Sequence, residues 1–136
     1  ATLVELKTDR IVSLITDEDM EVLRVTELPQ QIAEQGMDWD HLPFEDTTVP
    51  DRAWLEAAKP VFRSLLTNIP EGENVVVHCM GGLSRAGVFV SIYLWLRGSS
   101  MENAIARVRK ERSSRAINPR QEEFLFRLEK TGYNVE

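Results

Sequence analysis

The segment from residue 75 to residue 97 constrains the fold of this chain more than any other. It opens with Val75–Val77, a short β-branched run that is typical of a buried strand. A turn with two glycines, Gly81 and Gly82, follows, and then comes an almost wholly apolar run from Ala86 to Leu96. That length suits a helix buried in a core and is too short to span a membrane. The segment therefore predicts a strand, a tight loop and a buried helix in succession.

Strand-like and helix-like stretches alternate along the chain. Short β-branched or aromatic runs at 11–15 and 39–42 predict two further strands. Apolar periodicity and capping residues predict helices over 17–35 (with a break near Pro29 and an end at Gly36), 51–66, 85–97, 101–112 and 121–130. This order predicts an α/β fold, in which a mostly parallel central sheet has helices on both faces. The 136 residues suit a single domain, 1–136.

The composition argues against several classes of protein. The formal net charge is −6, so the chain lacks the basic surface that nucleic-acid binding needs. The single cysteine, Cys79, excludes an internal disulfide and fits a reducing compartment, so we expect a cytoplasmic protein. Besides Cys79, only His41 and His78 offer sulfur or imidazole ligands, which are too few for a zinc site. We expect no metal and no cofactor.

Charge is distributed unevenly along the chain. Residues 17–51 include eleven acidic side chains and one basic side chain, whereas residues 97–120 include seven basic and two acidic ones. Both stretches fit solvated helix faces. A second interpretation is that the basic stretch flanks an anion site and steers anionic substrates toward it.

Cys79 and Arg85 stand at the two ends of the glycine turn, which follows the predicted strand. In parallel sheets, ligands bind beyond the carboxyl ends of the strands. The free N–H groups at the start of the next helix, together with the loop amides, can cradle a phosphate, and their field favours a thiolate. Arg85 supplies a planar fork for two phosphate oxygens. The alternative is an inert buried cysteine with Arg85 as a surface charge.

The loop and its flanks resemble the signature of the protein tyrosine and dual-specificity phosphatases. The matching residues are His78, Cys79, Gly82 and Arg85. Around Gly82 the sequence is most similar to the cyclin-dependent-kinase-associated phosphatase group and its bacterial and phage relatives. Residues 41–51 resemble that group's general-acid loop, in which an aspartate follows an apolar-proline step. The resemblance extends over most of the chain, from residue 11 to residue 124.

The resemblance implies a role for each matching residue. Cys79 is the expected nucleophile, Arg85 binds the phosphate, and Asp46 is the expected general acid. Glu45 and Asp51 compete with Asp46, although Asp51 is better explained as the cap of the next helix. The residues expected to bind the substrate phosphate are Met80, Gly81, Gly82, Leu83, Ser84 and Arg85.

Four further residues have supporting roles in this interpretation. His78 is expected to hydrogen-bond within the loop and to hold the thiolate environment. Gln121 resembles the glutamine that positions the hydrolytic water in related enzymes, and Asn118 is a second candidate. We expect Ser84 to bond the loop backbone or to replace in part a hydroxyl that the family carries at position 86.

Two departures from the family pattern are visible. Ala86 stands where members commonly carry Ser or Thr, whose hydroxyl helps the thiolate to leave in the second step. Some relatives of the kinase-associated group resemble this chain in having alanine there. Residues 1–10 look like the end of a helix, and family members usually have one or two strands before this point. We therefore expect an N-terminally truncated sheet.

The expected substrate is a phosphorylated protein, with a kinase among the candidates. Met80 and Leu83 lie where phosphoinositide phosphatases of the superfamily carry lysines, which disfavours a lipid. No tyrosine-recognition loop is evident, so a shallow cleft would accept phosphotyrosine and also phosphoserine or phosphothreonine. Phosphate or another oxyanion is expected in the loop, and neither nucleic acid nor a membrane is an expected partner.

Three alternatives stay open at this point. A pseudophosphatase would bind phosphorylated partners without turnover, and Ala86 is the feature that favours it. A rhodanese-type sulfurtransferase also uses a cysteine in an anion-binding loop, but its loop is normally shorter. Asp46 would have no role in that reaction. A cysteine protease would need a histidine near Cys79. His78 faces away along a strand, so only His41 would be left.

Overall fold

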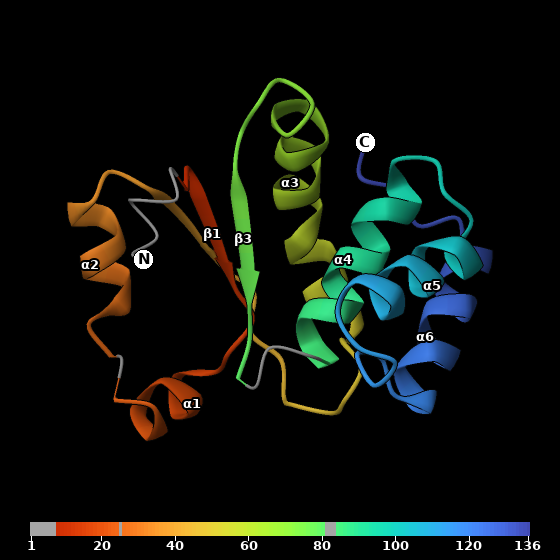
Figure 1. Ribbon diagram of the computed structural model, residues 1–136, viewed down its shortest axis with the longest axis horizontal. Coiled ribbons are helices and arrows are strands. Elements are labelled where there is room, and N and C mark those ends of the chain that lie inside the picture. The colour runs from red at the N-terminus through yellow and green to blue at the C-terminus, as the bar shows by residue number, and fades with distance from the viewer. Residues whose placement is uncertain (1–7, 25, 81–83) are drawn as a thin grey trace.

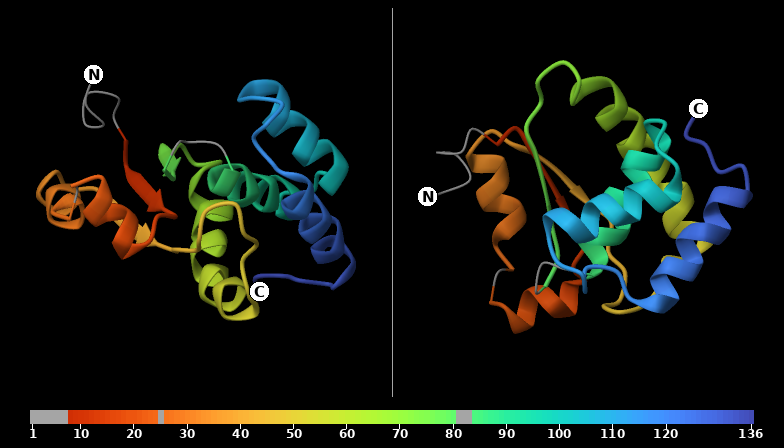
Figure 2. Two further views of the ribbon diagram at one scale, coloured as in Figure 1. Left: turned by 90° about the horizontal axis from the view of Figure 1, so that it is seen from below. Right: turned by 45° about the vertical axis from the view of Figure 1, so that its right-hand side comes forward.

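The computed structural model describes residues 8–24, 26–80 and 84–136. Its elements, in chain order, are β1 (Arg10–Ser13), α1 (Asp17–Val22), α2 (Leu28–Glu34), β2 (Asp38–His41), α3 (Arg52–Asn68), β3 (Val75–His78), α4 (Ser84–Leu96), α5 (Met101–Glu111) and α6 (Pro119–Lys130). Figure 1 shows the sheet between two groups of helices, with α1 and α2 on one side and α3 to α6 on the other. The two further views in Figure 2 agree. The predicted α/β class is confirmed.

The three described strands form one parallel sheet in the order β2-β1-β3. The strands are in register, so Ser13 in β1 lies level with His41 in β2 and with His78 in β3. Residues 11–13 of the central strand β1 are buried. Parallel strands all end at the same edge of a sheet, and the chain leaves β3 at this edge directly into Cys79.

Helix α4 lies at the centre of the larger helical layer. It is apolar on every side, which is the pattern of a fully buried helix, and it contacts β3, α3, α5 and α6. Phe89 of α4 stacks on Phe62 of α3 with ring centroids 4.6 Å apart. Gly87 is required by close packing, because a Cβ atom there would lie 2.7 Å from the carbonyl oxygen of Ala116. The loop after α5 is thereby held against the first turn of α4.

Some predicted boundaries were wrong. The helical stretch expected over residues 17–35 is broken, as predicted, but the break lies between Val22 and Leu28 and not near Pro29, which stands in the first turn of α2. Proline is tolerated there because the first N–H groups of a helix have no intrahelical acceptor. Gly36 follows α2 with φ 74°, as expected of a helix end. Of residues 1–10, expected to be the end of a helix, residues 1–7 lie outside the described residues, and Arg10 belongs to β1.

In the ranges that the structure describes, no helix is both long enough and apolar enough to cross a membrane.

Candidate active site

Cys79 lies at the junction of β3 and the turn that leads into α4. Its side chain is buried, with 9% of the residue exposed. The backbone N–H of Ala86, in the first turn of α4, donates to the Cys79 sulfur at 3.4 Å. The amino end of a helix thus points at the sulfur, where its unpaired N–H groups and partial positive charge favour an anion. Residues Gly81, Gly82 and Leu83, predicted to bind phosphate, lie outside the described residues.

Arg85 is completely buried, with 0% of its surface exposed, so the interpretation of Arg85 as a surface charge was wrong. Its Nη1 atom donates to a carboxylate oxygen of Asp19 at 2.7 Å and to the carbonyl oxygen of Phe44 at 3.1 Å. Its Nε and Nη2 atoms have no hydrogen-bond partner among the described residues. A buried guanidinium rarely leaves two nitrogens unpaired, because desolvating them costs free energy. These nitrogens are therefore available to a ligand.

The loop between β2 and α3 brings Asp46 beside Arg85. The Asp46 Oδ1 atom lies 3.7 Å from Arg85 Nε and accepts a hydrogen bond from the Ser84 hydroxyl at 3.0 Å. Half of the Asp46 side chain is exposed, so it faces both the buried arginine and solvent. Asp51 caps α3 by accepting from the Trp54 N–H at 2.8 Å, as predicted, and Glu45 is exposed. Of the three candidate acids, Asp46 is the one that contacts Ser84 and Arg85 in the described part of the chain.

Gln121 and Asn118 form a reciprocal capping box at the start of α6. The Gln121 side chain is fully buried, and its amide nitrogen also donates to the carbonyl oxygen of Thr48 at 3.2 Å. The Asn118 amide donates to the carbonyl oxygen of Thr47, which has φ 63° and so adopts a backbone conformation that is unfavourable for a β-branched residue. Both side chains therefore hold the loop that carries Asp46. A water-positioning role for either residue stays a prediction.

His78 turns its ring toward the central strand. Its Nε2 atom lies 2.5 Å from the hydroxyl oxygen of Ser13, which also accepts a hydrogen bond from the Trp39 indole at 2.8 Å. Burial, followed by the positive charges of Arg85 and His41, lowers the pKa of His78. A neutral ring is consistent with a Ser13 hydroxyl that donates to Nε2. His41 instead bonds the carbonyl oxygen of Ile15, so neither histidine forms a catalytic pair with Cys79.

Comparison with models of known protein families identifies the family of this chain. Residues 1–126 match the family model described as "Swiss Army Knife protein, DSP-PTPase phosphatase domain". The chain belongs to the dual-specificity and protein tyrosine phosphatase family. The resemblance inferred from the residues around Cys79 and Asp46 is confirmed at this level. Membership of a phosphatase family also disfavours the rhodanese-type alternative.

Relatives of this phosphatase domain support the assignment. The PRL-1 phosphatase of Drosophila melanogaster is 35% identical over 95 residues, covering 70% of this chain and 53% of that protein. Protein tyrosine phosphatase type IVA 3 of Mus musculus is 36% identical over 89 residues, covering 65% of this chain and 49% of that protein. The chain thus spans about half the length of these curated relatives.

Solved structures resemble the domain over almost all of its length. A kinase associated phosphatase with a serine in place of its catalytic-site cysteine has a TM-score of 0.85 at 24% identity, covering 94% of this chain and 72% of that one. The active form of Tk-PTP has a TM-score of 0.72 at 30% identity, covering 94% and 82%. The first likeness establishes the fold alone, and the second also supports membership of the family.

The phosphatase domain has one site residue that the sequence analysis missed. Asp19 lies in α1, on the other face of the sheet from α4, and its carboxylate pairs with buried Arg85. The hydrogen bond from Arg85 is the main cause that lowers the pKa of Asp19. The same Oδ2 atom of Asp19 also accepts a hydrogen bond from the Thr16 N–H, so this one oxygen both caps α1 and orients Arg85. In the sequence Asp19 is indistinguishable from an ordinary first-turn acid, because its partner lies 66 residues away.

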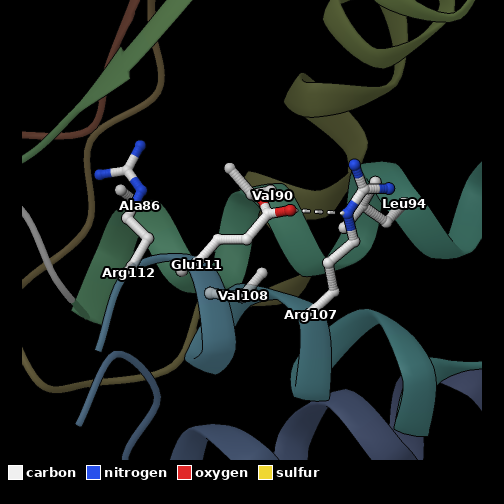
Figure 3. A pocket seen from close by; sticks show the side chains of 8 residues that line it. Ala86, Val90, Leu94, Arg107, Val108, Glu111 and Arg112 are labelled. Carbon is white, nitrogen blue, oxygen red and sulfur yellow. Dashed lines mark hydrogen bonds and ion pairs between the residues drawn. The ribbon is translucent and has the colours of Figure 1, made fainter. Parts of the chain in front are cut away.

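A separate hollow of about 240 Å³ lies between α4 and α5 of the phosphatase domain. Figure 3 shows the ion pair between Arg107 and Glu111 spanning its wall, and Arg112 near Ala86. Neither Cys79 nor Asp46 lines it, so it is not the site of the proposed chemistry. Within the described ranges, no three His, Cys, Asp or Glu side chains gather where they would hold a metal ion.

Proposed function

We propose that this domain hydrolyses phosphate monoesters of phosphorylated proteins through a cysteinyl-phosphate intermediate on Cys79. The observation that carries the proposal is the state of Arg85, a fully buried guanidinium with two nitrogens that donate no hydrogen bond to any described residue. Those nitrogens adjoin a loop whose cysteine accepts a helix N–H. A phosphate dianion would satisfy the two nitrogens in a bidentate geometry and would also meet the amino end of α4.

The reaction has two steps. In the first, the Cys79 thiolate attacks phosphorus, the ester P–O bond breaks, and Asp46 donates a proton to the leaving oxygen. In the second, water attacks phosphorus and returns a proton to Asp46, while the S–P bond breaks to release phosphate and the thiolate. Arg85 and the amides stabilise the charge on the equatorial oxygens in both steps, and no metal is required.

The second step is expected to be the slower one. Ala86 offers only its N–H to the Cys79 sulfur, whereas a hydroxyl at this position would stabilise the departing thiolate in related enzymes. The intermediate should therefore accumulate. Ala86→Ser should speed its breakdown, and an increase in the steady-state rate without a change in the initial burst of product would support this view.

The proposed substrates are phosphotyrosine proteins and, in an open cleft, phosphoserine and phosphothreonine proteins. Support comes from the half-exposed Asp46 side chain, which leaves the site accessible from solvent. A phosphorylated kinase is one candidate, because one structural neighbour is named as kinase associated. Matched peptides that differ only in the phosphorylated residue would rank these substrates.

Replacing the nucleophile tests the proposal. Cys79→Ser should lower hydrolysis of nitrophenyl phosphate by roughly 10⁴–10⁶-fold, because a serine hydroxyl is not ionised at neutral pH. Stabilisation of the protein by vanadate or phosphate should persist in this variant, since Arg85 and the amides remain. Wild-type turnover should also continue in excess chelator. If the wild-type domain binds phosphate esters but releases no phosphate, the pseudophosphatase alternative is correct.

A further inference from the structure

Ser84, the first residue of α4, contacts the loop that carries Asp46. Its hydroxyl donates to Asp46 Oδ1 at 3.0 Å across 38 residues of sequence. The neighbouring residue, Arg85, contributes only an ion pair at 3.7 Å from Nε to the same oxygen. The Ser84 hydroxyl is therefore the one hydrogen bond from α4 to Asp46 in the described part of the chain.

The two oxygens of Asp46 are in different environments. Oδ1 accepts hydrogen bonds from the Ser84 hydroxyl and from the Thr47 N–H at 2.9 Å, and it also faces Arg85. No described residue donates to Oδ2. A proton avoids an oxygen that already accepts from several donors, so in this geometry Oδ2 is the oxygen left to carry a proton to the leaving group. Anchoring Oδ1 thus fixes the direction in which Oδ2 points.

The far side of the same loop is held by α6. Asn118 donates to the Thr47 carbonyl oxygen at 3.1 Å and Gln121 to the Thr48 carbonyl oxygen at 3.2 Å. These bonds fix the backbone of the loop but leave the Asp46 side chain free to rotate. Ser84 adds the contact that fixes the carboxyl group itself relative to α4, and therefore relative to Arg85 and Cys79.

We propose that Ser84 is a positioning residue that aligns Asp46 for proton transfer to the leaving group. The proposal rests on the proposed function, in which Asp46 is the general acid. It differs from the two roles expected for Ser84 from the sequence, which were bonding the loop backbone and replacing the hydroxyl missing at position 86. Its consequence is that Ser84 matters most for esters whose leaving oxygen needs a proton.

The test compares two leaving groups in two variants. For Ser84→Ala we expect kcat/KM on an alkyl phosphate to fall roughly tenfold further than kcat/KM on nitrophenyl phosphate, whose leaving group departs without a proton. Ser84→Thr keeps the hydroxyl and should restore the wild-type ratio between the two esters. Thermal denaturation with and without inorganic phosphate verifies that each variant folds and binds phosphate.

An Asp46→Asn background separates the two possible failures. In that background Ser84→Ala should change both esters by the same factor, since no acid is left to align. If Asp46→Asn itself leaves the ratio between the esters at the wild-type value, the proposed acid is wrong. If Asp46→Asn changes that ratio while Ser84→Ala lowers both esters equally, the positioning role of Ser84 is wrong and the hydroxyl serves only the phosphate loop.

Discussion

Two arginines, the partly buried Arg10 and the fully buried Arg85, lie at opposite ends of the parallel sheet, and their surroundings differ. Arg10, at the start of β1, directs Nη1 to Asp40 at 2.6 Å and Nε to Glu73 at 3.1 Å, and Nη2 lies 3.7 Å from Asp38. Arg85, beyond the other end, bonds through Nη1 alone, and no described residue accepts a hydrogen bond from its Nε or Nη2. A guanidinium whose nitrogens all face carboxylates of the protein stabilises the fold. A guanidinium that keeps two nitrogens without a described acceptor is instead available to bind a ligand.

The largest difference expected between the two arginines is in the effect of replacement by lysine, which keeps the charge but loses the planar fork. Arg85→Lys should lower kcat/KM roughly 10³–10⁵-fold, because it removes bidentate stabilisation of the transferring phosphoryl group. Arg10→Lys should leave kcat/KM at the wild-type value and lower the free energy of unfolding by roughly 1–3 kcal/mol. Steady-state kinetics and urea denaturation measure both. Equal losses of kcat/KM in the two variants would contradict the assignment of a structural role to Arg10 and a phosphate-binding role to Arg85.

Asp19 sharpens the comparison, because it is the carboxylate that fixes Arg85. Asp19→Ala removes the acceptor of Nη1, so Arg85 becomes less well oriented and more of its buried nitrogens lack partners. We expect kcat/KM to fall roughly 10–100-fold and unfolding to become easier by roughly 1–3 kcal/mol. Inorganic phosphate should recover part of the lost stability, since it pairs with the guanidinium of Arg85 that has lost its carboxylate partner. Arg85 Nη1 also donates to the carbonyl oxygens of Phe44 at 3.1 Å and of Leu14 at 3.5 Å. Unchanged kinetics in Asp19→Ala would mean that these two oxygens suffice to orient the guanidinium.

The smallest expected effect concerns pH and His78. Its lowered pKa, caused mainly by burial, means that the unfolded chain binds this proton at a higher pH than the folded one does. The corresponding stability is therefore complete above about pH 6.5, the ordinary pKa of histidine, and is lost as the pH falls below it. One proton limits the slope to about 1.4 kcal/mol per pH unit. Urea denaturation from about pH 5 to about pH 8 should show a flatter profile for His78→Gln than for the wild type.

The sequence predicts the parts of the site that local structure decides. Val75–Val77 end in a turn with two glycines before an apolar run, and this pattern was enough to predict a strand, a loop and a buried helix around Cys79. The cap of α3 at Asp51 was equally predictable, because a side-chain cap bonds an N–H only three residues away. The predicted strands at 11–15 and 39–42 differ from β1 and β2 by one or two residues.

Contacts between distant segments were not predictable in this way. Asp19 and Ser84 looked like a helix-cap residue and a loop residue, and their partners Arg85 and Asp46 become apparent only when α1, α4 and the loop after β2 are placed together. The break in the helical stretch was predicted near Pro29, because proline cannot continue a helix that has already begun. Its position in the first turn of α2 depends on where the preceding helix stops.

The most direct test of the account is the capture of the intermediate. The wild-type domain would be mixed with nitrophenyl phosphate, quenched in acid within the first turnover, and mapped by peptide mass spectrometry. Because Cys79 is the only cysteine in the chain, a thiol-linked phosphate has a single possible position. The account predicts phosphate on Cys79 in the wild type and its absence in Cys79→Ser. Turnover without phosphate on Cys79, or with phosphate on another residue, would contradict it.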